Sequence, residues 1–247
     1  MKKIKTAIIG GSGLSKLTSL KNVRREVGRT PYGDPSAPLT IGTLGRDEVI
    51  FLPRHGLNHH IPPHQVNYRA NIWVLKSMGV EKIYAVGATG GISPELKPRD
   101  IVVPSQLIDY TYGREQSYYD GSNNKVEHID FTHPYSENLR QNIIQAANKA
   151  KFDIVKQGVY GVTQGPRLET AAEINRLDKD GCTIVGITGM PEAALARELE
   201  IDYALISLVV NAAAGRGEDK IISMDEIYAH LEAGMMSVCE LFEALLG

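Results

Sequence analysis

The sequence predicts an α/β fold with a largely parallel central sheet. Along the chain, short apolar runs alternate with segments of helical periodicity, which is the order expected of strands and helices in an α/β fold. Several of the short runs are nearly continuous in Ile, Val, Leu and Ala, as expected of strands that are covered on both faces. The chain has 247 residues, a length that fits one domain over residues 1–247.

The apolar runs place the expected strands at residues 6–9, 49–52, 83–86, 101–104, 158–163, 184–187 and 204–210. The helical patterns cover residues 66–78, 137–149, 170–177, 191–199 and 224–246. Ser223 is the expected N-cap of the last helix, and Pro191 suits a first helical turn, where its missing N–H is not needed. Residues 32–65 and 110–135 remain as long irregular stretches, which are usually functional.

Composition and charge narrow the classes of function. The formal net charge is −2, so the chain lacks the basic surface that holds nucleic acid or anionic lipid, and neither is expected as a partner. The two cysteines, Cys182 and Cys239, are expected to be reduced, buried thiols. The N-terminal apolar run is too short for a signal peptide, and no run reaches the length of a membrane span, which predicts a cytoplasmic protein.

A glycine-rich segment, GGSG at residues 10–13, directly follows the first expected strand. Glycines let backbone N–H groups approach an anion closely, and Ser12 adds a hydroxyl. The fingerprint of dinucleotide-binding proteins would require a third glycine where Lys16 stands, so an NAD-dependent oxidoreductase is disfavoured. Taken alone, the segment is equally compatible with a plain strand-to-helix turn.

The segment PRHG at residues 53–56 follows a second expected strand. Arg54 offers a planar fork that matches phosphate oxygens, and His55 can donate a further hydrogen bond. The run of histidines from His55 to His64 could instead indicate a metal site. It lacks companion carboxylates at ligand spacing, so no metal is expected.

Four further segments also close expected strands: VGATGGI at 86–92, QGPRLET at 164–170, GITGMPE at 186–192 and VVNAAAG at 209–215. In open α/β sheets, ligands bind outside the carboxyl ends of the strands, so these segments are expected to form one composite anion site. Glu169 and Asn211 could each serve only as a helix cap.

Together these segments, with VNYRANIWVLK at 66–76 and MPEAALARE at 190–198, resemble the trimeric purine nucleoside phosphorylase and methylthioadenosine phosphorylase family from end to end. The resemblance implies one α/β domain around a mixed, partly barrel-like sheet, and a homotrimer with sites at subunit interfaces. It implies a pentosyltransferase that uses inorganic phosphate as co-substrate and needs no cofactor. The phosphate site that it implies comprises Ser12, Arg54, His55, the backbone around Ala88 and Thr89, and Thr188.

The same resemblance implies a nucleoside site with some departures from the family pattern. Leu168 replaces the usual Phe at the base-stacking position, and Ile187 replaces the usual Met under the ribose. Both changes keep an apolar wall. Gly90 and Ala213 are expected beside the bound nucleoside.

The identity of the purine base follows from hydrogen-bond patterns. Hypoxanthine and guanine present an N1–H donor and an O6 acceptor, whereas adenine presents the inverse, so one polar pocket rarely suits both. Glu169 can accept N1–H, and Asn211 can donate to O6 and hold N7. Adenine-specific relatives carry Asp-x-Asp at residues 211–213, where this chain has Asn-Ala-Ala. We therefore expect a 6-oxopurine, with Glu169, Asn211 and His55 as the catalytic candidates.

The sugar end of the site is expected to be apolar. Nucleoside-type relatives use a His early in the last helix for the ribose 5′-hydroxyl, but this chain has Ile222 and Met224 there. An apolar lining suits a 5′-methylthio group, although the same residues could belong to the core. His128 matches a residue that methylthioadenosine phosphorylases lend from the neighbouring subunit.

The expected reaction is therefore the phosphorolysis of S-methyl-5′-thioinosine to hypoxanthine and 5-methylthioribose 1-phosphate. The alternatives within this class are a general 6-oxopurine nucleoside phosphorylase, acting on inosine and guanosine, and a 5′-methylthioadenosine phosphorylase. The alternative from another class is a non-catalytic nucleotide-binding module.

Overall fold

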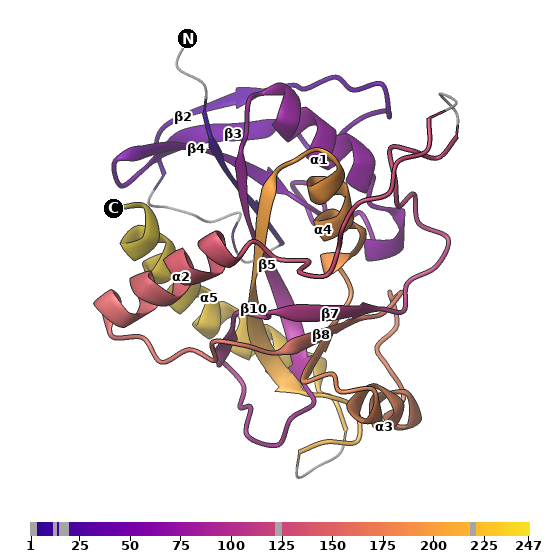
Figure 1. Ribbon diagram of the computed structural model, residues 1–247. Coiled ribbons are helices and arrows are strands. Elements are labelled where there is room, and N and C mark those ends of the chain that lie inside the picture. Colours follow the sequence, from indigo (N-terminus) through magenta and orange to yellow (C-terminus); the bar gives the residue numbers. More distant parts are fainter. Residues whose placement is uncertain (1–3, 12–13, 15–19, 122–124, 218–220) are drawn as a thin grey trace.

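The computed structural model describes residues 4–11, 14, 20–121, 125–217 and 221–247 (Figure 1). Within these ranges one sheet of ten strands runs through the molecule. Its main path has the order β2 (Lys21–Glu26), β3 (Leu39–Leu44), β4 (Asp47–Pro53), β1 (Thr6–Gly10), β5 (Lys82–Gly91), β9 (Ile184–Gly186), β8 (Val159–Val162) and β7 (Gln106–Asp109). Strand β10 (Asp202–Ala212) pairs with β5 and carries the short β6 (Ile101–Val102).

The pairing is mixed. Strands β4, β1, β5 and β10 run parallel to one another, as do β9, β8 and β7. Antiparallel pairs join β2 to β3, β3 to β4, β5 to β9 and β6 to β10. The long strands β5 and β10 connect the upper and lower parts of the sheet (Figure 1). The predicted α/β fold with a mixed central sheet is confirmed, and its described strands form an open sheet that branches at β5.

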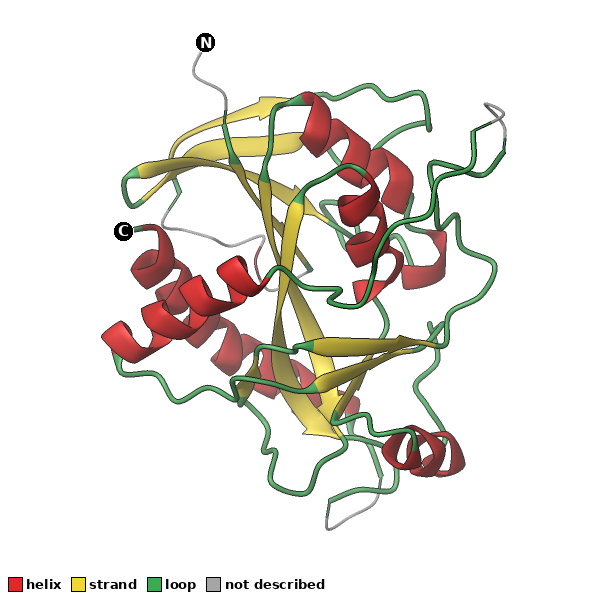
Figure 2. Ribbon diagram, in the orientation of Figure 1, coloured by secondary structure: helices red, strands yellow, loops and turns green. Residues whose placement is uncertain are grey.

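Helices cover both faces of the sheet (Figure 2). Helices α1 (Tyr68–Ser77) and α4 (Gly189–Glu198) lie on one face, and α2 (Glu137–Ala150) and α5 (Met224–Leu246) lie on the other. Neighbouring residues of β1 therefore enter different cores: Ile9 packs in the cluster that contains Tyr68, and Ile8 packs in the one that contains Phe242. This two-sided burial explains why the central strands lack polar alternation.

The smaller helical elements lie near the ends of these strands. Helix α3 (Ala171–Lys179) packs against β9 through Ile174 and Leu177, and the 3₁₀-helix η2 (Pro63–Gln65) precedes α1. Thr170 caps α3 in a reciprocal capping box with Glu173. Ser223 caps α5, as predicted, by accepting a hydrogen bond from the Glu226 backbone N–H.

The structure differs from the sequence prediction in its strand boundaries. Strands β2, β3 and β7 were not predicted; β2 is an exposed strand of mainly charged residues, so it carries no apolar signal. The predicted strand at 101–104 ends at Val102, near Pro104, which has no amide to donate to a ladder. The strand expected at 83–86 continues through the glycine-rich segment after it, so residues 87–91 form the second half of β5, where Gly90 and Gly91 pair with β9.

The predicted start of the fourth helix at Pro191 fits the backbone angles. Helix α4 begins formally at Gly189, but Met190 has extended angles (φ −119°, ψ 142°), so continuous helical geometry begins only after it.

Both cysteines are free thiols, with Cys182 buried and Cys239 half-buried. Burial raises the pKa of both thiols, which favours their protonated, unreactive form. Among the described helices, none is sufficiently long and apolar to cross a bilayer.

Candidate active site

A cavity of about 240 Å³ lies where the ends of β1, β4, β5, β9 and β10 meet the beginning of α5. Its wall contains nearly all of the site residues predicted from the sequence. These are Arg54, His55, Ala88, Thr89, Gly90, Leu168, Glu169, Ile187, Thr188, Asn211, Ala213, Ile222 and Met224. Ser12 lies outside the described residues, although its neighbour Gly11 lines the cavity. His128 is exposed and does not line this cavity.

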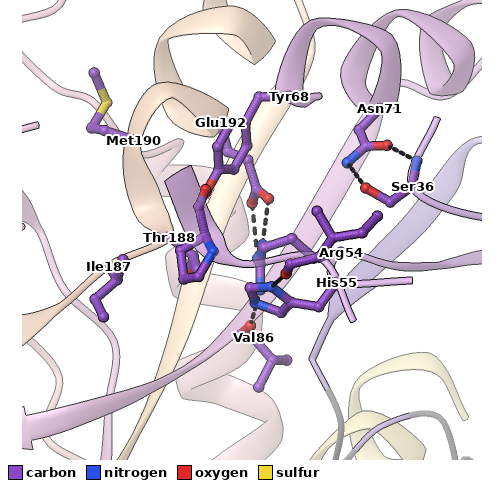
Figure 3. Close-up of polar contacts among 12 residues, drawn as sticks. Ser36, Arg54, His55, Tyr68, Asn71, Val86, Ile187, Thr188, Met190 and Glu192 are labelled. Atoms are coloured by element: carbon purple, nitrogen blue, oxygen red, sulfur yellow. Dashed lines mark hydrogen bonds and ion pairs between the residues drawn. The ribbon is translucent and has the colours of Figure 1, made fainter. Parts of the chain in front are cut away.

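Arg54 is a buried cation held in a fixed orientation just after β4 (Figure 3). Its Nε and Nη2 donate to the two carboxylate oxygens of Glu192 at 2.5 and 2.9 Å, and Nη1 donates to the Val86 carbonyl at 2.9 Å. Burial opposes the charged form of the guanidinium, but the adjacent Glu192 carboxylate more than offsets this and raises the pKa of Arg54. Arg54 is therefore protonated, and it keeps one unused N–H on each of Nη1 and Nη2.

His55 is neutral at physiological pH. Burial and the charge of Arg54 lower the pKa of His55 to about 4. Its Nδ1 lies 2.9 Å from the Ile61 carbonyl, which can only accept, so Nδ1 carries the proton and Nε2 presents a lone pair. The sequence reasoning expected His55 to donate to phosphate; this tautomer makes Nε2 an acceptor instead.

The middle of β5 forms the floor beside Arg54. The Thr89 hydroxyl donates to the Leu208 carbonyl at 3.2 Å, so it is occupied, while the backbone of Ala88 and Thr89 borders the cavity. A side chain at Gly87 would lie 3.5 Å from the Thr188 hydroxyl, so the start of α4 approaches this strand closely. The predicted use of backbone at Ala88 and Thr89, with a hydroxyl from Thr188, is compatible with these positions.

A second group of polar residues borders the same cavity. Glu169 accepts a hydrogen bond from the Thr163 hydroxyl at 2.5 Å, which fixes one carboxylate oxygen. Asn211 donates from Nδ2 to the Ala212 carbonyl at 2.6 Å. The register of β10 shifts between Val209 and Asn211, and such a bulge re-aims side chains near functional sites.

The wall that α5 contributes is apolar. Met224 is the first residue of this helix and lines the cavity, as does Ile222, which lies two residues before the helix begins. Ile227, Leu231 and Met235 continue the wall along the helix, and the sequence reasoning missed them. Their spacing along the helix was visible, but it is the same spacing that a core-facing helix shows.

Arg114 was also missed, although the irregular stretch 110–135 was expected to be functional. Its guanidinium is buried and donates to the backbone carbonyls of Ile187 and Gln164 at 2.8 and 2.7 Å, and to those of Met190 and Thr163. Arg114 thereby ties the segment after β8 to the segment after β9. Both segments border the cavity through Glu169 and Ile187.

Among the described residues, no group of three His, Cys, Asp or Glu side chains is arranged to hold a metal ion. His55 and His59 lie with their ring centroids 4.6 Å apart, and both line the cavity.

Comparison of the sequence with known protein families identifies the class of protein to which the chain belongs. Residues 5–247 match the Phosphorylase superfamily, so the chain belongs to this family. The prediction of a purine nucleoside phosphorylase, a pentosyltransferase, is confirmed.

Individual relatives are similar over nearly the full length. The chain is 53% identical to a probable S-methyl-5′-thioinosine phosphorylase of Pseudomonas syringae pv. tomato, over 94% of each chain. It is 46% identical to a 6-oxopurine nucleoside phosphorylase of Pyrococcus furiosus, over 87% of this chain and 82% of the relative. The crystal structure of methylthioadenosine phosphorylase from Schistosoma mansoni in complex with adenine superposes with a TM-score of 0.91 at 34% identity, covering 98% of this chain and 91% of that one.

Proposed function

We propose that the protein cleaves S-methyl-5′-thioinosine with inorganic phosphate, producing hypoxanthine and 5-methylthioribose 1-phosphate. The observation that carries this proposal is the division of one cavity into three parts. A fixed cation lies at Arg54, an acceptor and an amide lie at Glu169 and Asn211, and α5 supplies a continuous apolar wall.

Phosphate is proposed to bind beside Arg54. The two unused N–H groups of Arg54, the Thr188 hydroxyl, the Ser12 hydroxyl and the backbone at Ala88 and Thr89 donate to its oxygens. Hydrogen phosphate dianion retains one P–OH group, which donates to the lone pair on Nε2 of His55. His55 thus selects the protonated oxygen, so the deprotonated oxygens face the sugar.

In the reaction, a phosphate oxygen forms a bond to the anomeric carbon while the bond from that carbon to N9 breaks. The electron pair of the broken bond leaves with the purine, and positive charge builds on the sugar ring next to the phosphate dianion. The hypoxanthine anion then takes up one proton and the new phosphate ester gives up its P–OH proton, so the products are neutral hypoxanthine and the dianion of 5-methylthioribose 1-phosphate. Such preorganised electrostatic stabilisation is usually the largest catalytic contribution. The second N–H of Asn211 Nδ2, which the Ala212 carbonyl leaves unused, stabilises the negative charge that spreads toward N7 and O6.

The choice of base follows from Glu169. One of its oxygens accepts from Thr163, so the other is left for the N1–H of hypoxanthine. Adenine would present its N1 lone pair to this carboxylate, and the repulsion disfavours adenine nucleosides.

The choice of sugar follows from the α5 wall. A 5′-methylthio group needs no hydrogen bond, whereas a 5′-hydroxyl buried against Ile222, Met224 and Ile227 would lose its partner at a cost of about 1–3 kcal/mol. We further propose that the active form is a cytoplasmic homotrimer, in which His128 of one subunit closes the 5′ end of the neighbouring site.

The test is an assay of S-methyl-5′-thioinosine, 5′-methylthioadenosine and inosine with phosphate, scored by kcat/KM. The highest value is expected for S-methyl-5′-thioinosine. Equal values for inosine would favour a general 6-oxopurine nucleoside phosphorylase, for which the relative from Pyrococcus furiosus is the precedent. If none of the three released free base, the nucleotide-binding alternative would replace the proposal.

A further inference from the structure

A buried chain of three side chains lies behind the phosphate side of the cavity. It links Arg54 after β4, Glu192 in α4 and Tyr203 in β10. Glu192 accepts from Arg54 Nε and Nη2, and the Tyr203 hydroxyl donates to Glu192 Oε2 at 3.0 Å. The exposed fractions of the three residues are 1%, 0% and 2%. The three elements that hold them are far apart in sequence, so the tertiary fold alone brings the groups together.

Both carboxylate oxygens of Glu192, the Tyr203 hydroxyl and three of the five N–H groups of Arg54 have a defined partner in this buried chain. Oε1 of Glu192 takes the Arg54 Nε–H, and Oε2 takes both an Arg54 Nη2–H and the Tyr203 hydroxyl. The Val86 carbonyl takes one Nη1–H of Arg54. The guanidinium therefore cannot rotate without breaking buried hydrogen bonds, which is costly away from water.

The pair also balances its own charge. Glu192 and Arg54 together carry no net charge, so a phosphate beside them meets an oriented pair of N–H groups rather than an isolated cation. Phosphate affinity then depends on where the unused N–H groups point. Glu192 and Tyr203 can control the direction of these N–H groups, because they fix the orientation of the Arg54 guanidinium.

We propose that Glu192 and Tyr203 are positioning residues for phosphate: Glu192 fixes the Arg54 guanidinium, and the Tyr203 hydroxyl fixes Glu192. This proposal rests on the proposed function, because Arg54 is there the phosphate-binding group. It assigns a role to two buried residues that do not themselves touch the substrate.

A second tyrosine supplies a matched control. Tyr135 lies next to Tyr203 with the rings stacked, 6.2 Å apart at 20°, and it is equally buried. Within the described part of the chain, the Tyr135 hydroxyl has no hydrogen-bond partner. Tyr203→Phe and Tyr135→Phe thus remove the same atom from neighbouring rings, and only Tyr203→Phe removes a bond to Glu192.

The experiment measures the KM for phosphate at saturating nucleoside, the KM for nucleoside at saturating phosphate, and the Kd of inorganic phosphate by calorimetry. Tyr203→Phe is expected to raise the phosphate KM and Kd about tenfold, the worth of one hydrogen bond to a charged group. The nucleoside KM should change less than about twofold. Tyr135→Phe should leave all three within about twofold of wild type. Glu192→Gln should raise the phosphate KM by about a hundredfold.

Two results would overturn the positioning role. One is a phosphate KM and Kd that are the same for Tyr203→Phe and Tyr135→Phe; the other is an equal rise of the phosphate and nucleoside KM in Tyr203→Phe. If Glu192→Gln does not fold, the comparison of Tyr203→Phe with Tyr135→Phe still tests the positioning role. Failure of the proposed function is distinct: wild type would then bind phosphate without releasing base, and calorimetry of the variants would still test the positioning.

Discussion

His55 is predicted to make the protein less stable as the pH falls from 7 to 4. Burial and the charge of Arg54 lower the pKa of His55 to about 4 in the folded protein, against 6.5 for an ordinary histidine. Between these values the unfolded chain binds a proton that the folded protein does not, so the free energy of unfolding decreases as the pH falls through this window. From pH 7 to pH 4, the loss from this one group is about 3 kcal/mol.

The variant His55→Asn isolates this contribution. Its amide can replace Nδ1–H in the hydrogen bond to the Ile61 carbonyl, and it does not titrate. The assay is urea unfolding across the range from pH 7 to pH 4. The stability of wild type minus that of His55→Asn should fall by about 3 kcal/mol. His133→Asn, which removes an exposed imidazole, is the control. A difference between wild type and His55→Asn that stayed constant with pH would refute the assignment of a neutral, desolvated His55.

Three further predictions concern the cavity wall. Arg114→Lys keeps the charge but loses the fork that reaches several carbonyls, a loss of about 2 kcal/mol that, at about 2–4 °C per kcal/mol for a chain of this length, should lower the melting temperature in calorimetry by roughly 4–8 °C; an unchanged melting temperature would contradict the role of Arg114 in tying the two segments together. The double variant Asn211→Asp with Ala213→Asp should shift the ratio of kcat/KM from S-methyl-5′-thioinosine toward 5′-methylthioadenosine, and retained preference for hypoxanthine nucleosides would show that the base assignment is wrong. Met224→His gives a 5′-hydroxyl a partner, so kcat/KM for inosine relative to S-methyl-5′-thioinosine should rise about tenfold; no relative gain would count against the assignment of the 5′ end.

Much of the site was predictable because strand ends carry recognisable residues. Arg54 and Asn211 stand at the carboxyl ends of β4 and β10, and the carboxyl ends of parallel strands gather in an open α/β sheet. Glu169 follows β8, whose group of strands is joined antiparallel to β5 at β9. The resemblance to a known family then supplied their roles. The cavity brings these three residues together with the glycine-rich strand β5.

Hydrogen-bond and ion-pair partners that are distant in the sequence were not predictable. Glu192 was visible only as an acid in the first turn of a helix, where it could have been a simple dipole partner. Its partner Arg54 is 138 positions away in the sequence, and only packing of α4 against the sheet reveals the pair. Arg114 likewise lies in an irregular stretch whose function was expected but whose target carbonyls were not.

Two local patterns were ambiguous for physical reasons. The glycines of β5 were expected to follow the end of the strand at 83–86, yet Gly90 and Gly91 lie within the strand and complete an antiparallel pairing with β9, because glycine permits close approach of another backbone. The apolar stripe of α5 predicts a helix face that packs on the core, but Ile227 and Leu231 on this stripe line the cavity. The spacing of apolar residues shows which face of a helix is apolar, but it does not show whether protein or ligand covers that face.

The most direct test of phosphorolysis is the product balance from S-methyl-5′-thioinosine with and without inorganic phosphate. With phosphate, hypoxanthine and 5-methylthioribose 1-phosphate should appear in equal amounts, and without phosphate neither should form. Release of hypoxanthine together with free 5-methylthioribose at the same rate in both conditions would contradict the phosphate site at Arg54 and would identify a hydrolase instead.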